Sequence, residues 1–492
     1  MEFLKSLPAS RTLLLINIVL SVFYFICVVW LFPIGNPVLF VFLIISEVFH
    51  VWQVATYIYT VWPKKVSHAF SSDIHPDVAV YITVCGEPAE IIEKTVVAAL
   101  RMNYEQKKIY ILNDGKVAKR DNWREAEAIA KRHGIECITR TVPGGAKAGN
   151  INNALTQTTE PYVVVFDADH VPYKTFLQKT MGYFVDDRVA FVQSPQFYHN
   201  ADTNQVAGGA WDQQTLFFGP LLKGKDTRNS AFMCGTNMVI RRKALDEVGG
   251  MSEQSIAEDF LTSLLVHTNK WKSVYVSTVL AEGLAPEDFL SYYKQQFRWA
   301  RGSLELLFSY NPLFRRGLKW AQKIQYLSSA SYYLSGLIIL INALLPLVYF
   351  FFALKPLTIN TMFLALIFLP YIFVILYTLQ MTSNFTYTFR ALSFSVGSFA
   401  IYIKALWHTI IRKKNGFVVT SKTRLGGTHG RLVAPHLIYI GLVAVGIAWG
   451  VFREGWSASM LSNSAWAFIY VAAFTPFIMA AFEREKKKVV AS

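Results

Sequence analysis

Long apolar runs flank a central segment in which apolar and polar positions alternate over short distances. A helix needs about 20 mostly apolar residues to cross the core of a bilayer. The pattern therefore predicts two membrane spans before the central segment and four after it. The predicted spans cover residues 13–32, 38–62, 327–354, 361–381, 437–452 and 466–482.

The central segment, from residue 77 onward, alternates short apolar strands with helical stretches. Alternation of this kind predicts a Rossmann-like α/β domain built on a largely parallel sheet. The chain is therefore expected to be an α/β domain inserted in an all-α transmembrane bundle. The predicted strands are 78–84, 109–112, 162–166, 190–193 and 274–276.

Residues 388–412 form a different kind of segment, in which Lys404, His408 and Arg412 recur at four-residue spacing among aromatic and aliphatic side chains. A helix with such a basic stripe is typical of the membrane interface, where long cations reach the headgroups. A seventh span is the alternative, but it would place the basic cluster 412–414 outside and reverse every later loop. We therefore expect an interfacial helix.

The composition is that of a membrane protein, since 53% of the 492 residues are hydrophobic and 16% are charged. Subtracting 33 acidic from 48 basic residues gives a net charge of +15. Many basic residues lie at predicted cytoplasmic flanks, including 64–65, 412–414 and 486–488, as the positive-inside bias requires. This distribution favours a plasma-membrane protein with both termini and the central domain in the cytosol, and it argues against nucleic acid as a partner.

Two further features bear on location. The first predicted span is followed at once by a second and has no small-residue cleavage site, so an uncleaved hairpin is expected rather than a signal peptide. The cysteines lie too far apart in the sequence to suggest a metal-ligand set or a disulfide framework, which favours a reducing compartment. The four cysteines are Cys27, Cys85, Cys137 and Cys234.

Acidic residues follow three of the predicted strands. Glu87 follows the first, Asp114 the second, and an Asp-Ala-Asp triplet with Asp167 and Asp169 the third. Ligands of open α/β sheets bind at the carboxyl ends of the strands. Two carboxylates at this spacing can share a hard cation such as Mg²⁺ or Mn²⁺ that also contacts phosphate oxygens. Each motif alone is also explained by an ordinary turn, and their shared placement at strand ends is what favours a site.

Two later motifs add chemistry. Glu258 and Asp259 can accept a proton from an attacking hydroxyl, although a solvated acidic helix start is the plain alternative. Gln295, Arg298 and Trp299 lie in an aromatic-rich segment just before the third predicted span. Arginine forms paired hydrogen bonds to a diphosphate, and tryptophan stacks on sugar rings. An amphipathic interface helix would explain this second motif equally.

The order of these motifs resembles the D, DxD, ED, QxxRW signature of processive family 2 glycosyltransferases. Four further stretches, 147–152, 192–196, 232–237 and 417–422, are similar to bacterial cellulose synthases, and the last resembles their FxVTxK gating loop. The likeness covers roughly residues 77–430. It implies a GT-A fold, and no cyclic-di-GMP-binding PilZ domain is evident.

The resemblance also implies roles for single residues. Asp259 would be the catalytic base, with Glu258 beside it, and Asp167 and Asp169 would hold the metal. The nucleotide-sugar would contact Glu87, Asp114, Lys147, Gln295, Arg298, Thr420 and Lys422, and the acceptor would contact Trp299, Cys234 and Phe417. The positions that depart from the family's pattern are Cys85, Gly86, Asn113 and Ala257.

These expectations define five parts of the chain. They are two transmembrane helices in 1–70, the glycosyltransferase domain with its acceptor helix in 71–312, spans three and four in 313–384, the interfacial helix and gating-like loop in 385–433, and spans five and six with a basic tail in 434–492. The expected activity is processive, inverting synthesis of a cellulose-like β-glucan from UDP-glucose, with export across the membrane.

Three alternatives stay open from the sequence. One is a hyaluronan- or chitin-type synthase that uses another UDP-sugar, and the second is a non-processive enzyme that glycosylates a lipid-linked acceptor. A transporter or receptor with a degenerate transferase domain is disfavoured because the acidic groups are present. The expected partners are a UDP-sugar, the growing polysaccharide, the lipid bilayer, and accessory export or regulatory subunits.

Overall fold

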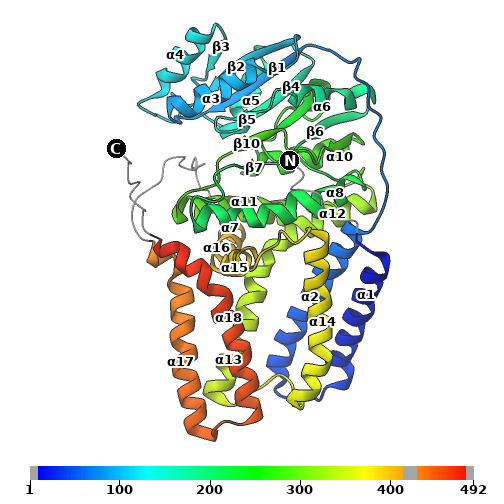
Figure 1. Ribbon diagram of the computed structural model, residues 1–492, viewed down its shortest axis with the longest axis vertical. Coiled ribbons are helices and arrows are strands. Elements are labelled where there is room, and N and C mark those ends of the chain that lie inside the picture. Colours follow the sequence, from blue (N-terminus) through cyan, green and yellow to red (C-terminus); the bar gives the residue numbers. More distant parts are fainter. Residues whose placement is uncertain (1–8, 414–428, 484–492) are drawn as a thin grey trace.

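The computed structural model describes residues 9–413 and 429–483. An α/β domain lies at one end of the molecule and a bundle of long helices at the other (Figure 1). Four helices lie at the level where the two parts meet: α11 (Phe289–Ser309), α12 (Trp320–Ser331), α15 (Phe389–Gly397) and α16 (Phe399–Ile410).

The α/β domain is built on a seven-stranded sheet with the order β3-β2-β1-β4-β8-β6-β9. Five of its strands match the predicted ones: β1 (Val78–Val84), β2 (Lys107–Asn113), β4 (Tyr162–Asp167), β6 (Val189–Gln193) and β9 (Lys272–Tyr275). The short strands β3 (Glu136–Thr139) and β8 (Met238–Arg241) were not predicted. Only β8 runs antiparallel, to β4 and β6, so the largely parallel sheet is confirmed for the described residues.

The parallel strands β1, β2 and β4 end at the same edge of the sheet. Val84 pairs with Asn113 and Thr83 pairs with Asp167 in the register of these strands. The residues that follow each strand are therefore brought together. A three-stranded sheet with the order β5-β10-β7 completes the domain, with β5 at Val171–Pro172, β7 at Phe197–Tyr198 and β10 at Ala281–Gly283.

Helices cover both faces of the seven-stranded sheet, and alternate residues of β1 enter two different cores. Val78, Val80 and Ile82 pack with α3 (Ala89–Leu100) and α4 (Trp123–His133). Ala79 and Tyr81 pack on the opposite face. The helices of that face are α5 (Ala146–Leu155), α9 (Arg242–Asp246) and α10 (Glu258–Thr268), and the shorter connections contain α6 (Phe176–Thr180), α7 (Gln205–Leu216) and α8 (Leu222–Asp226).

Each of the six predicted spans corresponds to a long apolar helix. These are α1 (Arg11–Ile26, continued by a π-helical turn, Cys27–Leu31), α2 (Pro37–Val61), α13 (Ser335–Phe352), α14 (Thr361–Thr382), α17 (Ala434–Glu454) and α18 (Ala458–Phe482). By length and composition, seven segments of the described chain can cross a membrane, and the seventh is Phe389–Ile410.

The seventh candidate, however, is two helices that meet at Ser398, α15 with 9 residues and α16 with 12. Neither alone has the roughly 20 residues that a span requires. The ammonium of Lys404 lies 5.2 Å from the centre of the Tyr293 ring, and the His408 ring packs edge-on against Phe297. These two members of the basic stripe thus contact α11, and the interfacial placement of the segment stays a prediction.

Polar contacts fix the depth of α12 relative to α2. Gln325 donates a hydrogen bond to Thr60, Ser328 donates to Thr56, and the Trp52 indole donates to Ser331, at 2.9, 3.1 and 3.0 Å. Successive turns of α12 thus meet successive turns of α2 in antiparallel order. The N-terminus of α12 therefore lies level with the C-terminal end of α2 or beyond it.

Candidate active site

The Asp-Ala-Asp triplet forms a tight turn at the end of β4. Thr83 donates a hydrogen bond of 3.1 Å to Oδ1 of Asp167, and the backbone N–H of Asp167 donates to Thr236 at 2.9 Å. On the other side of the turn, the buried Thr95 of α3 donates a hydrogen bond of 2.6 Å to the carbonyl oxygen of Ala168. The turn is thus fixed by side chains from β1, α3 and the loop before β8.

Asp167, Asp169 and His170 present one ligand atom each within 4.8 Å of one another. Asp169 and His170 are 2% and 3% exposed. Neither ring nitrogen of His170 has a hydrogen-bond partner in the described part of the chain, which is unusual for a buried imidazole. The two carboxylates fit Mg²⁺ or Mn²⁺, and an added imidazole nitrogen favours the transition metal Mn²⁺ of the two. His170 was not predicted, although it directly follows the triplet in the sequence.

Lys147 lies at the start of α5, after the left-handed residues Gly144 and Gly145. Its ammonium donates hydrogen bonds to Oδ1 of Asp167 and, at 2.7 Å, to the carbonyl oxygen of Gly235. Burial tends to raise the pKa of Asp167, but the charges of Lys147 and His170 lower it below its usual value. The predicted phosphate-binding lysine therefore contacts the Asp-Ala-Asp turn directly.

The second strand ends in a network around Asp114. The guanidinium of Arg140 donates to both carboxylate oxygens of Asp114, at 2.6 and 2.7 Å. Asn113 is fully buried and accepts a hydrogen bond from the backbone N–H of Gly115 at 2.9 Å. Nearby, Glu87 accepts a hydrogen bond of 2.5 Å from the backbone N–H of Cys85. Arg140 was not predicted because it lies 26 residues from its partner in the sequence.

Glu258 and Asp259 begin α10 and face Lys147 across Gly235. A Cβ atom on Gly235 would lie 3.2 Å from Oδ2 of Asp259 and 3.8 Å from the Lys147 ammonium, and Gly235 has a φ of +82°. Burial and the neighbouring Glu258 charge raise the pKa of Asp259 to about 7. Burial also raises the pKa of Glu258, and the charges of Lys147 and Arg298 oppose that shift. Such an acidic group, poised near neutral pH, is suited to general-base chemistry.

Cys234 lies beside this carboxylate pair. Burial raises the pKa of its thiol well above the usual value, and the negative charge of Asp259 adds to the effect. The thiol is therefore neutral at physiological pH. The Cys234 backbone N–H donates a hydrogen bond of 2.8 Å to Gln193, at the end of β6.

The helix α11 carries Gln295, Arg298 and Trp299. It is capped by Asp288, which accepts a hydrogen bond of 2.8 Å from the backbone N–H of Ser291. The Gln295 side chain lies near the hydroxyl of the buried Tyr198, whose pKa burial raises and Gln295 partly lowers. The positive charge of Arg298 opposes the rise in the pKa of both Asp259 and Glu258. The predicted diphosphate-binding arginine therefore lies within electrostatic reach of the acidic pair.

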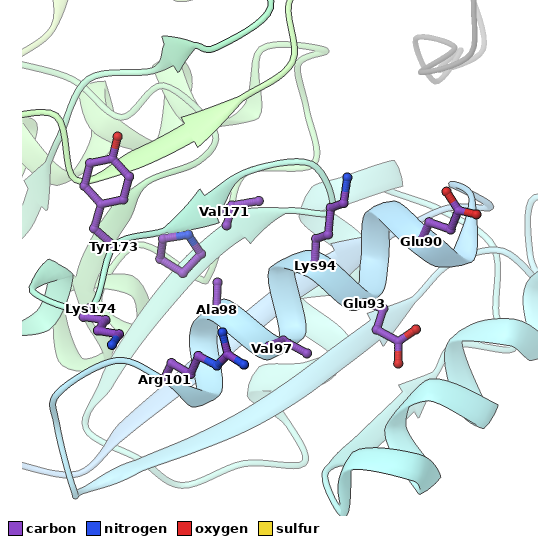
Figure 2. Close-up of a pocket in the computed structure, with 10 residues that line it drawn as sticks. Glu90, Glu93, Lys94, Val97, Ala98, Arg101, Val171, Tyr173 and Lys174 are labelled. Carbon is purple, nitrogen blue, oxygen red and sulfur yellow. The ribbon is translucent and has the colours of Figure 1, made fainter. Parts of the chain in front are cut away.

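The structure thus gathers most predicted site residues at one edge of the sheet. The gating-like positions Phe417, Thr420 and Lys422 lie outside the described residues. A separate open groove of about 700 Å³ lies between α3 and β5 (Figure 2). Its lining includes Val97, Ala98, Val171 and Pro172 and none of the predicted site residues.

Two models of known protein families match the part of the chain that carries the candidate site. Residues 75–302 match a family model described as "Glycosyltransferase like family 2", and residues 246–394 match one described as "Cellulose synthase". The two matched segments contain every predicted site residue among the described ones.

Two of the similar curated proteins are bacterial cellulose synthase catalytic subunits. The chain is 30% identical over 418 residues to the cellulose synthase catalytic subunit (UDP-forming) of Pseudomonas fluorescens (strain SBW25), which covers 81% of this chain and 55% of that protein. It is 36% identical over 290 residues to the protein of the same description from Xanthomonas axonopodis pv. citri (strain 306), with 57% and 39% coverage. The chain thus spans about half of these relatives or less.

The structural likeness concerns the fold. The mannosyltransferase PcManGT from Pyrobaculum calidifontis, solved in complex with GDP-Man and Mn²⁺, superposes with a TM-score of 0.51 at 16% sequence identity. The superposition covers 82% of this chain and 100% of that one. It therefore supports the GT-A fold that the motifs implied.

Proposed function

The chain carries a glycosyltransferase domain of family 2, and we propose that this domain polymerises a cellulose-like β-glucan from UDP-glucose while the helix bundle exports the product. The observation that carries the proposal is the meeting of Asp167, Lys147 and Asp259 around Gly235. A metal-ligand carboxylate, a cation and a carboxylate with a pKa near 7 are the groups that nucleotide-sugar transfer requires.

Asp167, Asp169 and His170 would hold the divalent cation. A bound Mg²⁺ or Mn²⁺ would neutralise the charge of the leaving diphosphate. The buried imidazole of His170, with neither ring nitrogen hydrogen-bonded among the described residues, supports its inclusion beside the two predicted carboxylates. Lys147 and Arg298 add positive charge to the same region, where it would stabilise the diphosphate as it departs.

Asp259 would act as the general base. In its ionised form it removes the proton from the acceptor hydroxyl as that oxygen attacks the anomeric carbon of the donor. The bond between that carbon and the diphosphate oxygen breaks, and the nucleoside diphosphate leaves. Attack opposite to the leaving group inverts the centre, so an α-linked donor gives a β-linked product. Burial and the neighbouring Glu258 charge keep the Asp259 pKa high enough for this transfer.

The nucleotide would occupy the ends of β1 and β2. Asp114 and Glu87 face that region as hydrogen-bond acceptors for a base or ribose, and Arg140 fixes the orientation of the Asp114 carboxylate. Gln295 on α11 would bind the diphosphate of the donor. Thr420 and Lys422 are proposed to contact the nucleotide from the gating-like loop.

The acceptor would bind between α11 and Cys234, with Trp299 as a stacking surface and Phe417 as a contact from the gating-like loop. The helix α11 leads through α12 directly into α13, which belongs to the bundle. A chain elongated at α11 would therefore pass into the bundle without release. This continuity supports processive synthesis over a single transfer to a lipid-linked acceptor.

UDP-glucose is favoured as donor because the curated relatives are UDP-forming cellulose synthases. The proposed location is the plasma membrane, with the α/β domain and both termini in the cytosol, because basic residues concentrate on that side. Accessory export or regulatory subunits are proposed as further partners.

The deciding experiment incubates the purified, reconstituted chain with radiolabelled UDP-sugars and Mg²⁺ or Mn²⁺, and digests any polymer with linkage-specific glycosidases. A polymer made from UDP-glucose and degraded by a β-1,4-glucanase supports the proposal. A polymer made only from UDP-N-acetylglucosamine, or short lipid-extractable products, would replace it with one of the alternatives. The Asp259→Asn variant is the inactive control.

A further inference from the structure

The elbow between α11 and α12 exposes two large aromatic side chains next to several cations. Phe314 is 83% exposed and Trp320 is 70% exposed. The surrounding cations are Arg315, Arg316, Lys319 and Lys323. We call these six residues the elbow patch. An exposed aromatic pair within a cluster of cations is typical of a surface that meets a membrane interface.

The contacts between α12 and α2 place the elbow patch at the edge of the bilayer. Gln325 of α12 meets Thr60, one residue before the end of α2 at Val61. Trp320 begins α12 five residues earlier, which is about 7.5 Å further along the helix axis. Trp320 therefore lies near the level of the basic flank that follows α2, Lys64 and Lys65. Tryptophan is enriched at this depth, between the acyl chains and water.

The cations of the elbow patch divide into Arg315 and Lys323, which contact neighbouring residues, and two that do not. The Lys323 ammonium lies 5.0 Å from the centre of the Trp320 ring and donates a hydrogen bond of 2.7 Å to the carbonyl oxygen of Leu313. Arg316 and Lys319 are exposed, and neither side chain has a hydrogen-bond or ion-pair partner in the described residues. Lys323 thus orients the aromatic ring, while Arg316 and Lys319 are available to a ligand.

We infer that the elbow patch is a binding site for an anionic phospholipid. Trp320 and Phe314 would insert at the boundary of headgroups and acyl chains, and Arg316 and Lys319 would bind the phosphate and the further negative charge of the headgroup. None of the four cations is ion-paired with a carboxylate in the part of the chain that the structure describes. Their charge therefore favours a lipid with net negative charge over a zwitterionic one.

A lipid bound at the elbow patch would also affect α11, because the patch directly follows this helix. This helix carries Gln295, Arg298 and Trp299 and ends at Ser309, immediately before the elbow. A lipid bound at the elbow would fix the end of α11 against the membrane. The inference rests on the bundle spanning a membrane and is independent of which sugar the domain transfers, so a binding assay without substrate can test it.

The test measures which phospholipids the full-length chain retains from detergent micelles that contain equal amounts of phosphatidylglycerol and phosphatidylcholine. Headgroup analysis after gel filtration should show phosphatidylglycerol enriched on the wild-type protein. The double variant Arg316→Gln, Lys319→Gln should lose that enrichment, since each cation near a membrane surface favours anionic lipid by about fivefold. The matched control is Lys119→Gln, Lys131→Gln, which removes two exposed cations on and just before α4, far from the bundle (Figure 1).

A second measurement does not depend on the charge variants. Brominated phosphatidylglycerol should quench the tryptophan fluorescence of the wild-type protein more than that of Trp320→Phe, because only the former carries an indole at the elbow. Equal retention of phosphatidylglycerol by the wild type and the Arg316/Lys319 variant would overturn the inference. So would displacement of the bound lipid by millimolar glycerol phosphate, which would assign the cations to a soluble anion.

Discussion

Arg140 donates two parallel hydrogen bonds to Asp114, with Nε–Oδ1 and Nη2–Oδ2 distances of 2.6 and 2.7 Å. The same guanidinium donates to the carbonyl oxygens of Gly144 and Ala146, immediately before Lys147. One buried side chain thus holds together the two places where the nucleotide and its diphosphate are proposed to bind. Arg140 is therefore a positioning residue for donor binding.

Substitution of Arg140 by lysine should weaken donor binding, because an ammonium cannot make the paired contact with Asp114. We expect the KM for the UDP-sugar to rise roughly tenfold, the equivalent of about one lost charge-assisted hydrogen bond, while kcat changes less. Initial rates over a range of donor concentrations provide the measurement. Arg132→Lys, at the exposed ion pair with Glu93, is the control. A fall in kcat at constant KM would contradict the assignment.

Substitution of His170 by glutamine should weaken the metal site. The imidazole lies with Asp167 and Asp169 in one ligand cluster, and even outer-shell partners of metal ligands commonly change affinity by roughly 10- to 100-fold. We expect the Mn²⁺ concentration for half-maximal activity to rise at least about tenfold. Electron paramagnetic resonance of bound Mn²⁺ gives a readout without turnover. The control His133→Gln, at the surface pair with Glu93, should leave both the half-maximal Mn²⁺ concentration and Mn²⁺ binding unchanged. Equal Mn²⁺ binding by wild type and His170→Gln would refute the role of His170.

The sequence predicted the strands best where a local pattern of apolar residues has a single physical cause. The apolar run of β1 is buried at all seven positions, as a strand of a parallel sheet must be, and the strands that carry the predicted carboxylates end at one edge of the sheet. The strand β8 was missed because it is short and inserted antiparallel between β4 and β6. Nothing local distinguishes such a segment from a loop.

The residues missed in the site share a different cause. Arg140 acts on a carboxylate that only the parallel pairing of β2 and β3 brings near, and a lone arginine after a short strand carries no signal. His170 is adjacent to the triplet, but only its burial without a hydrogen-bond partner in the described residues singles it out. The sequence also does not show that Lys404 lies beside Tyr293 and Phe297 of α11, and the interfacial placement of its helix stays a prediction.

Thr95→Val tests whether the turn that carries the metal ligands needs its support from α3. The change keeps the side-chain shape but removes the 2.6 Å hydrogen bond to the Ala168 carbonyl oxygen, and an unpaired buried acceptor costs about 1 to 3 kcal/mol. The matched control, Thr180→Val, removes a buried hydrogen bond of 2.8 Å within α6. Both variants should lower the unfolding temperature, but only Thr95→Val should raise the Mn²⁺ requirement. Equal Mn²⁺ requirements in the two variants would show that the turn is held by other contacts.

The rate of sugar transfer should depend on pH through the ionisation of Asp259. Asp259 must be ionised to accept a proton, and its pKa is about 7 because of burial and the Glu258 charge. We expect kcat/KM to reach a plateau above neutral pH and to fall tenfold per unit well below it. Glu258→Gln removes the charge that raises the pKa, so the fall should begin at lower pH in that variant. A wild-type profile that is flat from about pH 6 to 8 would contradict a base with this pKa.

Asp259→Asn should abolish synthesis yet stabilise the fold, which separates a catalytic role from a structural one. In the unfolded chain the aspartate ionises near pH 4, whereas in the folded protein its pKa is about 7. Below about pH 4 the group is protonated in both states and costs nothing. As the pH rises from there to 7, only the unfolded state loses its proton, so stability is lost and the full cost remains above pH 7. The neutral asparagine carries no such cost, and we expect the variant to unfold a few degrees higher than wild type at pH 8, with the difference shrinking toward pH 4.

The loss of a general base should lower the rate by roughly 10²- to 10⁴-fold. Thermal unfolding and sugar incorporation on the same preparations measure both effects, with Asp187→Asn, whose side chain is 98% exposed, as the control. An inactive variant that is also less stable than wild type at pH 8 would mean that Asp259 supports the fold in its ionised form, and the assignment of its raised pKa would fall with it.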